Sequence, residues 1–512
     1  MKVRMQNSKM KILLRVLFSF LVIILFAAWL PRTQSRIFLI GDSTMADKPL
    51  VDNPEHGWGQ MLPLFFTQNV QIFNHAKNGR STKSFITEGR WKAVYDQLQP
   101  GDYVFIQFGH NDAKKEDTTR FAAPHTDYRN NLEKFVRETR EKKAIPILFT
   151  PVTRRDFDST GKYVGTHGDY PVVVKEVAKE KNVPLIDMFE KSKKIVEALG
   201  DEKSKSLFLN GVKKEFRNWD RKRDNTHFTR PGAVLMASLA VEGIKELHLS
   251  LENELVSMAP NNLAGTGKVV GLDYFFNNEW RARKEGGRER FHYTWEDTTN
   301  SGFSLLGKNI DLLGADLDTL QCSPIGSVLN RCSVYIIVDP DTPVETDKPN
   351  YMSEDAIKVI IPWVERGGVL VLMANDKGNA EFEHFNTLAE HFGIHFNEDS
   401  YHKVIGNNFE TGKSDHLPSH PIFKDVKQIY MKEICSLKIE KPAEPILTEN
   451  GLVLMASARV GKGLVFAVGD PWLYNEYIDS RKLPAEYENA KAGKNLFEWL
   501  LSNAGSTVHG LD

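Results

Sequence analysis

The sequence predicts two α/β domains within one chain of 512 residues. A chain of this length exceeds the usual size of a single core, and its 41% hydrophobic content is typical of a globular protein. From residue 36 to residue 249, short apolar runs alternate with longer polar segments of helical character, and a second alternation begins at residue 269. Because apolar runs of strand length are typical of strands buried on both faces of a parallel sheet, we expect a doubly wound α/β domain first.

Five apolar runs supply the strands of the first domain. They are RIFLI (36–40), VQIFN (70–74), DYVFIQF (102–108), IPILFT (145–150) and VPLID (183–187). The segment 251–268 lacks periodicity and contains Pro260, Gly265 and Gly267, which predicts a linker. We therefore assign residues 36–250 to the first domain and residues 269–505 to the second.

The second domain repeats the alternation with different motifs. Strands are expected at CSVYIIVDP (332–340), GGVLVLMAND (367–376) and GKGLVFAVGD (461–470). Amphipathic helices are expected at residues 355–366 and 379–393. This order again predicts an α/β domain.

Residues 1–35 form a candidate export signal. Five basic residues lie within the first 15 positions, and the run 16–30 that follows is apolar and uncharged. The run is shorter than the ~20 residues that span a bilayer, which favours a signal peptide over a retained N-terminal membrane anchor. Under either alternative the folded part is periplasmic or extracellular, and the second alternative leaves it associated with the inner membrane.

Charge and cysteine content exclude several classes of protein. The chain carries 66 Lys+Arg against 67 Asp+Glu and shows no nucleic-acid-binding motif, so no nucleic-acid partner is expected. Its three cysteines include no CxxC pair, which excludes cysteine metal clusters and a dense disulfide framework. We favour free thiols over a single bridge.

An acidic segment has a spacing that fits no calcium loop, so we interpret it as a solvated turn. Its acidic residues are Asp339, Asp341, Glu345 and Asp347.

Polar residues follow the predicted strands at the point where each strand ends. GDST (41–44) follows the first, HAKNGRS (75–81) the second, GHND (109–112) the third and PVTRR (151–155) the fourth. DNTHFTRPG (224–232) lies near the end of the domain, before a predicted helix. In an open parallel sheet, functional groups cluster outside the carboxyl ends of the strands. We therefore expect these segments to meet in space.

Ser43 allows two interpretations. Gly, Asp, Ser and Thr are common in turns and helix N-caps, so GDST alone fits an ordinary turn serine. Ser43 is a nucleophile only if a base lies beside it, and His227 is the candidate base, with Asp224 three residues earlier to orient its ring. The backbone N–H groups of Ser43 and Gly79 and the amide of Asn111 are the candidate oxyanion donors.

Together these motifs resemble the four sequence blocks of the SGNH (GDSL-like) hydrolases. GDSTMAD, NGRS, FGHND and DNTHFT are more narrowly similar to the rhamnogalacturonan acetylesterase branch of that superfamily. The resemblance covers about 210 residues and implies a flavodoxin-like, three-layer parallel-sheet domain. It also implies Ser43, Asp224 and His227 as catalytic triad, with Gly79 and Asn111 as oxyanion donors. It implies no metal and no organic cofactor.

Several further residues near the strand ends have competing interpretations. His110 is a candidate substrate contact or a structural residue beside Asn111. Arg80 and Arg154 are candidate ligands for uronate carboxylates, as is Arg155, but each also fits an ordinary solvated arginine. Trp58 is expected either to cover a sugar face or to pack beneath its loop.

The second domain resembles the class I glutamine amidotransferases in the strand GGVLVLMAND and the helix that follows it. Those proteins carry a nucleophilic cysteine on the tight turn in this region, where Asn375 and Asp376 stand here. A noncatalytic domain is therefore expected. Its aromatic and amide-rich segments fit either carbohydrate contact, docking on another enzyme or a structural role.

The export signal and the serine motifs predict an exported serine esterase, and the resemblance to the acetylesterase branch implies that it removes acetyl groups from carbohydrate. The expected substrate is an acetylated pectic polysaccharide or oligosaccharide, with rhamnogalacturonan favoured. A xylan acetylesterase, a lysophospholipase-like esterase and a noncatalytic glycan-binding protein are the alternatives. The polar loops argue against a lipid, because a long acyl chain needs an extended apolar groove.

Overall fold

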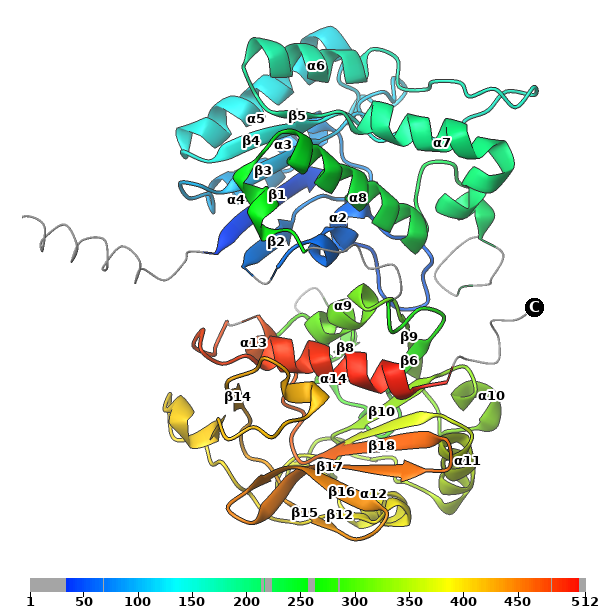
Figure 1. Ribbon diagram of the computed structural model, residues 1–512, viewed down its shortest axis with the longest axis vertical. Coiled ribbons are helices and arrows are strands. Elements are labelled where there is room, and N and C mark those ends of the chain that lie inside the picture. Colours follow the sequence, from blue (N-terminus) through cyan, green and yellow to red (C-terminus); the bar gives the residue numbers. More distant parts are fainter. Residues whose placement is uncertain are drawn as a thin grey trace, which may run out of the picture. The chain divides into compact units, whose positions relative to one another are not determined.

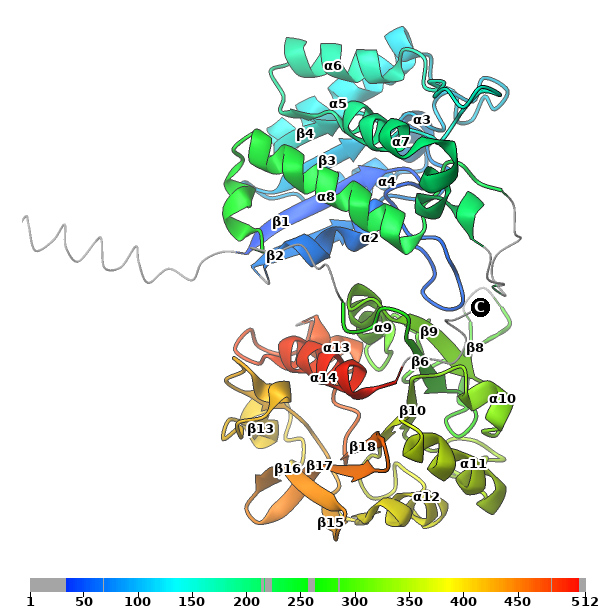
Figure 2. The same cartoon turned by 45° about the vertical axis from the view of Figure 1, so that its right-hand side comes forward.

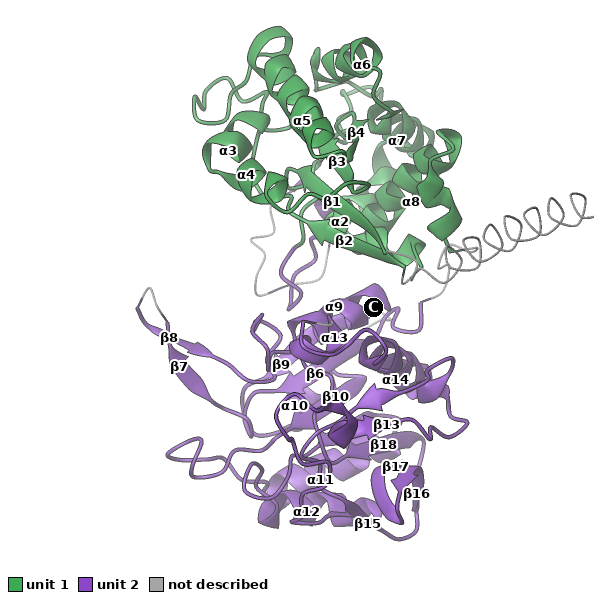
Figure 3. Cartoon of the chain, turned by 90° about the vertical axis from the view of Figure 1, so that its left-hand side faces the viewer, with its two compact units in different colours: residues 1–47, 56–208, 225–258 green, residues 48–55, 209–224, 259–512 purple. Residues whose placement is uncertain are grey.

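The computed structural model describes residues 34–67, 69–212, 216, 223–256, 263–283, 286–479 and 481–505. These residues form two compact units (Figure 3). The described part of unit 1 lies within 34–47, 56–208 and 225–256, and that of unit 2 lies within 48–55, 209–224 and 263–505.

Unit 1 is built on a parallel sheet, as the sequence predicts. Within the described residues the sheet has five strands in the order β2-β1-β3-β4-β5 (Figure 1). All five predicted runs contain a strand of this sheet, and this strand order is the flavodoxin-like one. The strands are β1 (Ser35–Gly41), β2 (Val70–Asn74), β3 (Tyr103–Gln107), β4 (Ile145–Phe149) and β5 (Leu185–Ile186).

Helices cover both faces of this sheet (Figure 2). Helices α3 to α6 pack on one face, and α2, α7 and α8 pack together on the other. The helices are α2 (Trp58–Met61), α3 (Thr82–Thr87), α4 (Arg90–Tyr95), α5 (Arg129–Glu141), α6 (Tyr170–Glu180), α7 (Met188–Ser204) and α8 (Arg230–Glu246). Short helical turns are η1 (Leu62–Phe65), η2 (Pro124–Tyr128), η3 (Lys205–Leu207) and η5 (Ser250–Glu254).

The apolar character of β1 follows from this layering. Phe38 and Ile40 belong to the same core cluster as Phe85 of α3 and Trp91 of α4. Leu39 alternates with them along the strand and is also fully buried. Successive side chains of a strand point to opposite faces, so a strand covered on both faces is apolar throughout.

Unit 2 has a larger, mixed sheet. Its described strands follow the order β12-β15-β17-β18-β11-β10-β6-β9, with β16 beside β17. The pairs from β9 to β18 are parallel, and those from β18 to β12 are antiparallel. The strands are β6 (Val269–Asp273), β9 (Asp316–Leu320), β10 (Val334–Val338), β11 (Val369–Met373), β12 (Ile394–Phe396), β15 (Leu437–Ile439), β16 (Ala443–Glu449), β17 (Leu452–Val460) and β18 (Gly463–Val468).

Helices and two small hairpins complete unit 2. The hairpins are β7 (Trp280–Ala282) with β8 (Arg288–Arg290), and β13 (Lys413–Ser414) with β14 (Ile429–Tyr430). The helices are α9 (Ser304–Leu312), α10 (Gly326–Leu329), α11 (Glu354–Glu365), α12 (Glu383–Ala389), α13 (Asn475–Ile478) and α14 (Asn489–Asn503). Short turns are η4 (Leu209–Gly211), η6 (Glu390–Phe392), η7 (Phe409–Gly412) and η8 (Pro421–Phe423).

The acidic segment after β10 is only in part the solvated turn that the sequence suggested, because Asp347 is exposed but the first two carboxylates are buried. Asp339 and Asp341 are buried, with 4% and 1% of their surface exposed. The Asp341 carboxylate accepts hydrogen bonds from the backbone N–H of Asn278 at 3.0 Å and the hydroxyl of Thr346 at 2.6 Å. These donors compensate Asp341 for lost water at Oδ2, while its Oδ1 is buried without a hydrogen-bond partner among the described residues.

The three cysteines are free thiols, of which Cys322 is exposed and Cys332 and Cys435 are buried. Burial raises the pKa of Cys332 to about 12 and that of Cys435 well above its usual value. The predicted signal or anchor at residues 1–35 lies outside the described residues, apart from its last two positions. No helix in the described part of the chain is long and apolar enough to cross a membrane.

Candidate active site

Ser43 lies in a tight loop directly after β1. Asp42 shapes this loop, because its carboxylate accepts from the backbone N–H of Thr44 at 2.9 Å and from the Thr44 hydroxyl at 2.7 Å. The chain passes close to β3 here: a side-chain carbon on Gly41 would come within 2.8 Å of the Gln107 carbonyl. The loop is therefore fixed by its own side chains, with Ser43 only 8% exposed.

His227 meets Ser43 at this loop. Its Nε2 lies 2.7 Å from Ser43 Oγ, although the two residues are 184 positions apart. The segment that carries His227 is held on both sides. The backbone N–H of His56 donates to the Phe228 carbonyl at 3.0 Å, and that of Arg155 donates to the Asn225 carbonyl at 2.8 Å. A serine hydroxyl bonded to an imidazole is the arrangement that makes serine a nucleophile.

Asp224 lies at the start of the same segment and is partly buried. Its backbone carbonyl accepts from the N–H of Asn210 at 2.9 Å, which fixes the chain three residues before His227. Its assignment as the acid that orients His227 remains a prediction from the sequence.

Two of the three candidate oxyanion donors come from the segments after β2 and β3. Gly79 has a φ of +76°, a left-handed conformation that favours glycine, in the turn closed by Arg80 N and Lys77 O at 3.2 Å. The N–H of Lys77 donates to the Gly41 carbonyl at 3.1 Å, so this turn is joined to the end of β1. Asn111 donates one amide hydrogen to the Arg80 carbonyl at 3.1 Å. An asparagine amide carries two hydrogens, so this bond orients the group and leaves a second donor.

A buried pair, formed by a carboxylate and an imidazole, lies beneath the nucleophile. The second carboxylate oxygen of Asp42 is 3.0 Å from His110 Nδ1, and both side chains are almost fully buried. Burial alone would raise the pKa of Asp42, but His110 and the bonds from Thr44 lower it to about 2. Burial lowers the pKa of His110 against the opposing effect of Asp42. Asp42 is therefore ionised, and the neutral His110 ring donates to it through Nδ1.

Asp112 holds the next loop. Its carboxylate accepts from the backbone N–H of Thr82 at 2.9 Å and from the Thr82 hydroxyl at 2.5 Å, at the first residue of α3. Its other oxygen is buried without a hydrogen-bond partner among the described residues. Burial raises the pKa of Asp112 to about 7, despite the bonds from Thr82.

Comparison with known proteins identifies the family of this chain. The GDSL-like Lipase/Acylhydrolase family matches residues 39–233. Rhamnogalacturonan acetylesterase RhgT of Bacillus subtilis (strain 168) is 44% identical over 223 residues, which make up 43% of this chain and 94% of that protein. The chain belongs to the GDSL-like hydrolase family.

Two further relatives of this GDSL-like chain are also described as rhamnogalacturonan acetylesterases, one of them as a probable one. Probable rhamnogalacturonan acetylesterase YesY of Bacillus subtilis (strain 168) is 38% identical, over 43% of this chain and 98% of that protein. Rhamnogalacturonan acetylesterase of Emericella nidulans is 27% identical, over 41% of this chain and 84% of that protein. The chain is thus a serine carboxylic ester hydrolase, and its relatives support a carbohydrate acetylesterase at the level of the family. The amidotransferase-like resemblance of unit 2 remains a prediction.

The residues predicted to contact the substrate already form hydrogen bonds or ion pairs within the protein. Arg80 pairs with Glu88 at 2.9 Å and donates to the Asn78 carbonyl at 2.9 Å. Arg154 donates to the His110 carbonyl at 3.1 Å. The buried His110 ring bonds to Asp42, as described above. Their roles toward a substrate remain predictions.

Two residues proposed as carbohydrate contacts are structural. Trp58 is fully buried and donates from its indole to Gln107 Oε1 at 2.7 Å, so it packs beneath the loop and covers no sugar. Arg155 is 3% exposed and donates to Asn225 Oδ1 at 2.9 Å. It therefore anchors the segment that carries His227 and is not a solvated side chain.

Sequence reasoning gave no role to Asp42 or Asp112. Both are carboxylates within the motif blocks GDST and GHND, and each is fully buried. The available signal was an acidic residue within a few positions of the end of an apolar strand, where a nearby donor has to compensate its burial. Among the described residues, His, Cys, Asp and Glu side chains form no cluster of three or more able to hold a metal ion.

Proposed function

We propose that this protein is a rhamnogalacturonan O-acetylesterase that works through an acetyl-enzyme on Ser43. The observation that carries the proposal is the 2.7 Å separation of His227 Nε2 and Ser43 Oγ. The description of the 44% identical Bacillus relative supports acetylated pectic polysaccharide as the substrate.

The reaction begins when Ser43 Oγ attacks the acetyl carbonyl carbon and its proton passes to His227 Nε2. Asp224 orients the imidazole and stabilises the imidazolium. The negative charge on the carbonyl oxygen is bound by the backbone N–H groups of Ser43 and Gly79 and by the Asn111 amide. The carbon–oxygen bond to the sugar then breaks, and the sugar oxygen leaves with the proton from His227.

Water completes the cycle. His227 takes a proton from water as the water oxygen attacks the acetyl carbon bound to Ser43. Collapse of the second tetrahedral intermediate releases acetate and returns the proton to Ser43 Oγ. Each proton taken by His227 is given back, so the residues named here need no metal or organic cofactor for the balance of the reaction.

The test compares acetate release from acetylated rhamnogalacturonan, acetylated xylan and a small aryl acetate. We expect rhamnogalacturonan to give the highest kcat/KM, a fluorophosphonate probe to label Ser43, and Ser43→Ala to abolish both activity and labelling. Labelling at another residue would reject the mechanism. Preference for xylan would reject the substrate and leave the mechanism standing.

The export segment supports a location outside the cytoplasm for this reaction. Residues 1–35 combine a basic start with an apolar run, the pattern of a signal peptide or anchor. Fractionation of the full-length protein in a Gram-negative host should place it in the periplasm, the medium or the inner membrane. Recovery in the cytoplasm would contradict the proposal.

A further inference from the structure

Unit 2 contains a pocket of about 540 Å³ that the esterase reaction does not use. Asn375, on its wall, follows β11, and Asp339, whose carboxylate accepts from the Asn375 amide at 3.4 Å, follows β10. Since β10 and β11 are parallel neighbours, the pocket lies at the carboxyl edge of the unit 2 sheet. That edge is where open α/β sheets bind ligands, and the volume is in the range of small-molecule sites.

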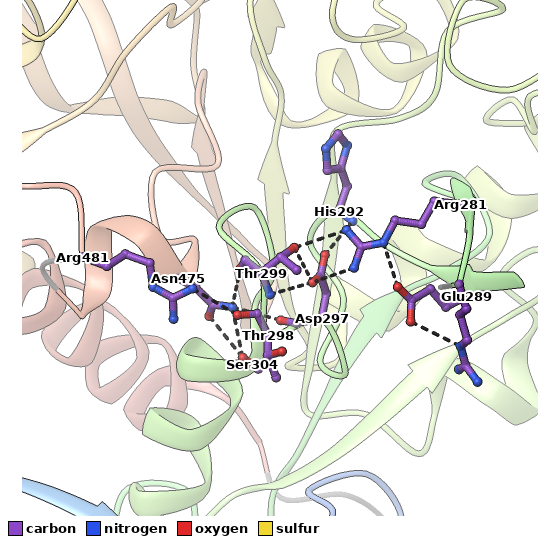
Figure 4. A network of polar contacts seen from close by, with 10 residues as sticks. Arg281, Glu289, His292, Asp297, Thr298, Thr299, Ser304, Asn475 and Arg481 are labelled. Atoms are coloured by element: carbon purple, nitrogen blue, oxygen red, sulfur yellow. Dashed lines mark hydrogen bonds and ion pairs between the residues drawn. The ribbon is translucent and has the colours of Figure 1, made fainter. Parts of the chain in front are cut away.

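One wall of this pocket is the loop of residues 297–302, which a dense polar network holds in place (Figure 4). Asp297 accepts from the backbone N–H and the hydroxyl of Thr299 at 2.8 and 2.6 Å. The fully buried Asn475 amide donates to the carbonyls of Asp297 and Thr299 at 2.9 and 2.8 Å. Arg481 donates to the Thr298 carbonyl at 3.1 Å. The loop is thus rigid before any ligand arrives.

Positive backbone angles recur among the residues around the pocket. His292, Tyr293 and Glu433 have φ values of 54°, 42° and 48°, and all three line the pocket. Such a conformation is costly for a residue other than glycine and persists only where surrounding contacts hold it. One such contact joins His292 Nδ1 to the buried Glu279 carboxylate at 2.6 Å.

The side chains that face the pocket contrast with this fixed backbone. Within the described residues, Asn300, Ser301, Lys432 and Glu433 make no side-chain hydrogen bond, although all four line the pocket. A rigid backbone that presents unused donors and acceptors is the arrangement of a preorganised binding site. An amide and a hydroxyl each donate and accept, which matches a ligand rich in hydroxyl groups.

The charges around the pocket select against an anion. Two carboxylates, Glu433 and Glu476, line it together with one ammonium group, Lys432. Lys482 approaches Glu476 at 3.3 Å and is not itself a lining residue. A uronate or phosphate would therefore meet repulsion from Glu433. The two lining tyrosines, Tyr293 and Tyr474, are 8% and 5% exposed, which leaves little open ring face for a planar base.

From these contacts we infer that unit 2 holds a second, noncatalytic site for one or two neutral sugar residues of a carbohydrate chain. The inference does not rest on the esterase assignment, because every residue that carries it belongs to unit 2.

Calorimetric titration of the full-length Ser43→Ala protein tests this site. Neutral galacto-, arabino- and xylo-oligosaccharides are titrated beside oligogalacturonides. We expect one binding event with at least one neutral series, weakened about 10-fold by Asn300→Ala and by Glu433→Gln. The first change removes an amide donor and acceptor, and the second replaces a charged acceptor with a neutral amide. Asn407→Ala and Glu440→Gln alter exposed residues of unit 2 that do not line the pocket, and should bind as the parent does.

Three outcomes would overturn the inference. They are the absence of binding by every neutral series, binding that Asn300→Ala and Glu433→Gln leave unchanged, and tighter binding of oligogalacturonides than of any neutral chain. Thermal unfolding of each variant establishes that the fold is kept. Because Ser43 is absent throughout, failure of the esterase proposal would not alter the result.

Discussion

The carboxyl edges of the two sheets differ in how their polar groups are used. In unit 1 the loop after β1 brings Ser43 Oγ to 2.7 Å from His227, and two buried carboxylates fix the loops around it. In unit 2 the loop after β11 carries Asn375, whose side-chain oxygen accepts from the N–H of Asp376 at 2.9 Å. Parallel topology gives both edges a place for a site, but the edge of unit 1 sets a base beside a nucleophile, whereas Asn375 of unit 2 bonds to its own neighbour.

The two edges also differ in the buried groups that support their polar residues. Beneath Ser43, Asp42 and His110 form a buried pair in which Asp42 carries the charge. Around the unit 2 pocket, the buried amide of Asn475 and the carboxylate of Asp297 secure backbone and leave side chains such as Asn300 open. Chemistry requires fixed reacting groups, whereas binding requires a fixed frame with unsatisfied groups.

Removal of the base, His227, should have the largest effect on activity and so distinguish most clearly between the carboxyl edges of the two sheets. His227→Ala is expected to lower kcat/KM for an aryl acetate by at least ~10³-fold, because Ser43 then lacks a proton acceptor. His125→Ala, at an exposed histidine of unit 1, is the matched control and should stay near the parent rate. A His227→Ala enzyme with near-normal turnover would remove the functional distinction between the units.

Loss of one oxyanion donor should have a smaller effect. Asn111→Ala is expected to reduce kcat by ~10²- to 10³-fold with little change in KM, because the amide acts on charge that develops in the transition state. Steady-state kinetics on the same ester measure both constants, with Asn130→Ala on the exposed side of α5 as control. A raised KM at constant kcat would assign Asn111 to substrate binding instead.

The buried carboxylate of Asp112 predicts a pH-dependent stability. Its pKa in the folded protein is about 7, above the value of 3.8 for an unfolded chain, so the folded state loses stability as pH rises from about 4 to 7. Asp112→Asn keeps an acceptor for Thr82 and removes this loss. We expect its Tm to exceed that of the parent by at least ~2 °C at pH 8 and by less at pH 5.

Thermal unfolding at both pH values, with the exposed Asp127→Asn as control, measures the effect. An equal difference in Tm at pH 5 and pH 8 would show that Asp112 does not change its charge in this range.

Changes at the unit 2 pocket should leave the chemistry almost untouched. Asn300→Ala is expected to keep kcat on the aryl acetate within about 2-fold of the parent, because every group assigned to the reaction lies outside the pocket. The same assay used for His227→Ala measures it. A large fall in kcat would show that the two edges are functionally coupled.

The sequence predicted much of this architecture because its signals are local. Each of the five runs of unit 1 is apolar over the length of a strand, and each contains a strand of the sheet. The motif blocks also marked Ser43 and His227, which the structure brings within hydrogen-bonding distance.

The remaining features depend on register and on contacts between distant segments. Asp42 and His110 are 68 positions apart and meet because Gly41 of β1 is paired with Gln107 of β3. Trp58 can be buried because its indole N–H donates to the side-chain oxygen of Gln107. No local sequence pattern reveals this contact. The segment at Asp339 seemed solvated because its acidic residues are dense, yet donors from other parts of unit 2 permit its burial.

The uneven exposure of the three cysteines gives this protein a single accessible thiol. Cys332 and Cys435 are shielded and stay protonated at neutral pH, since burial raises the pKa of each. A maleimide dye should therefore attach to Cys322 alone and report on unit 2 while Ser43 is assayed separately. In an oxidising compartment the same exposure lets two copies become joined through Cys322, so a reductant belongs in any preparation intended to be monodisperse.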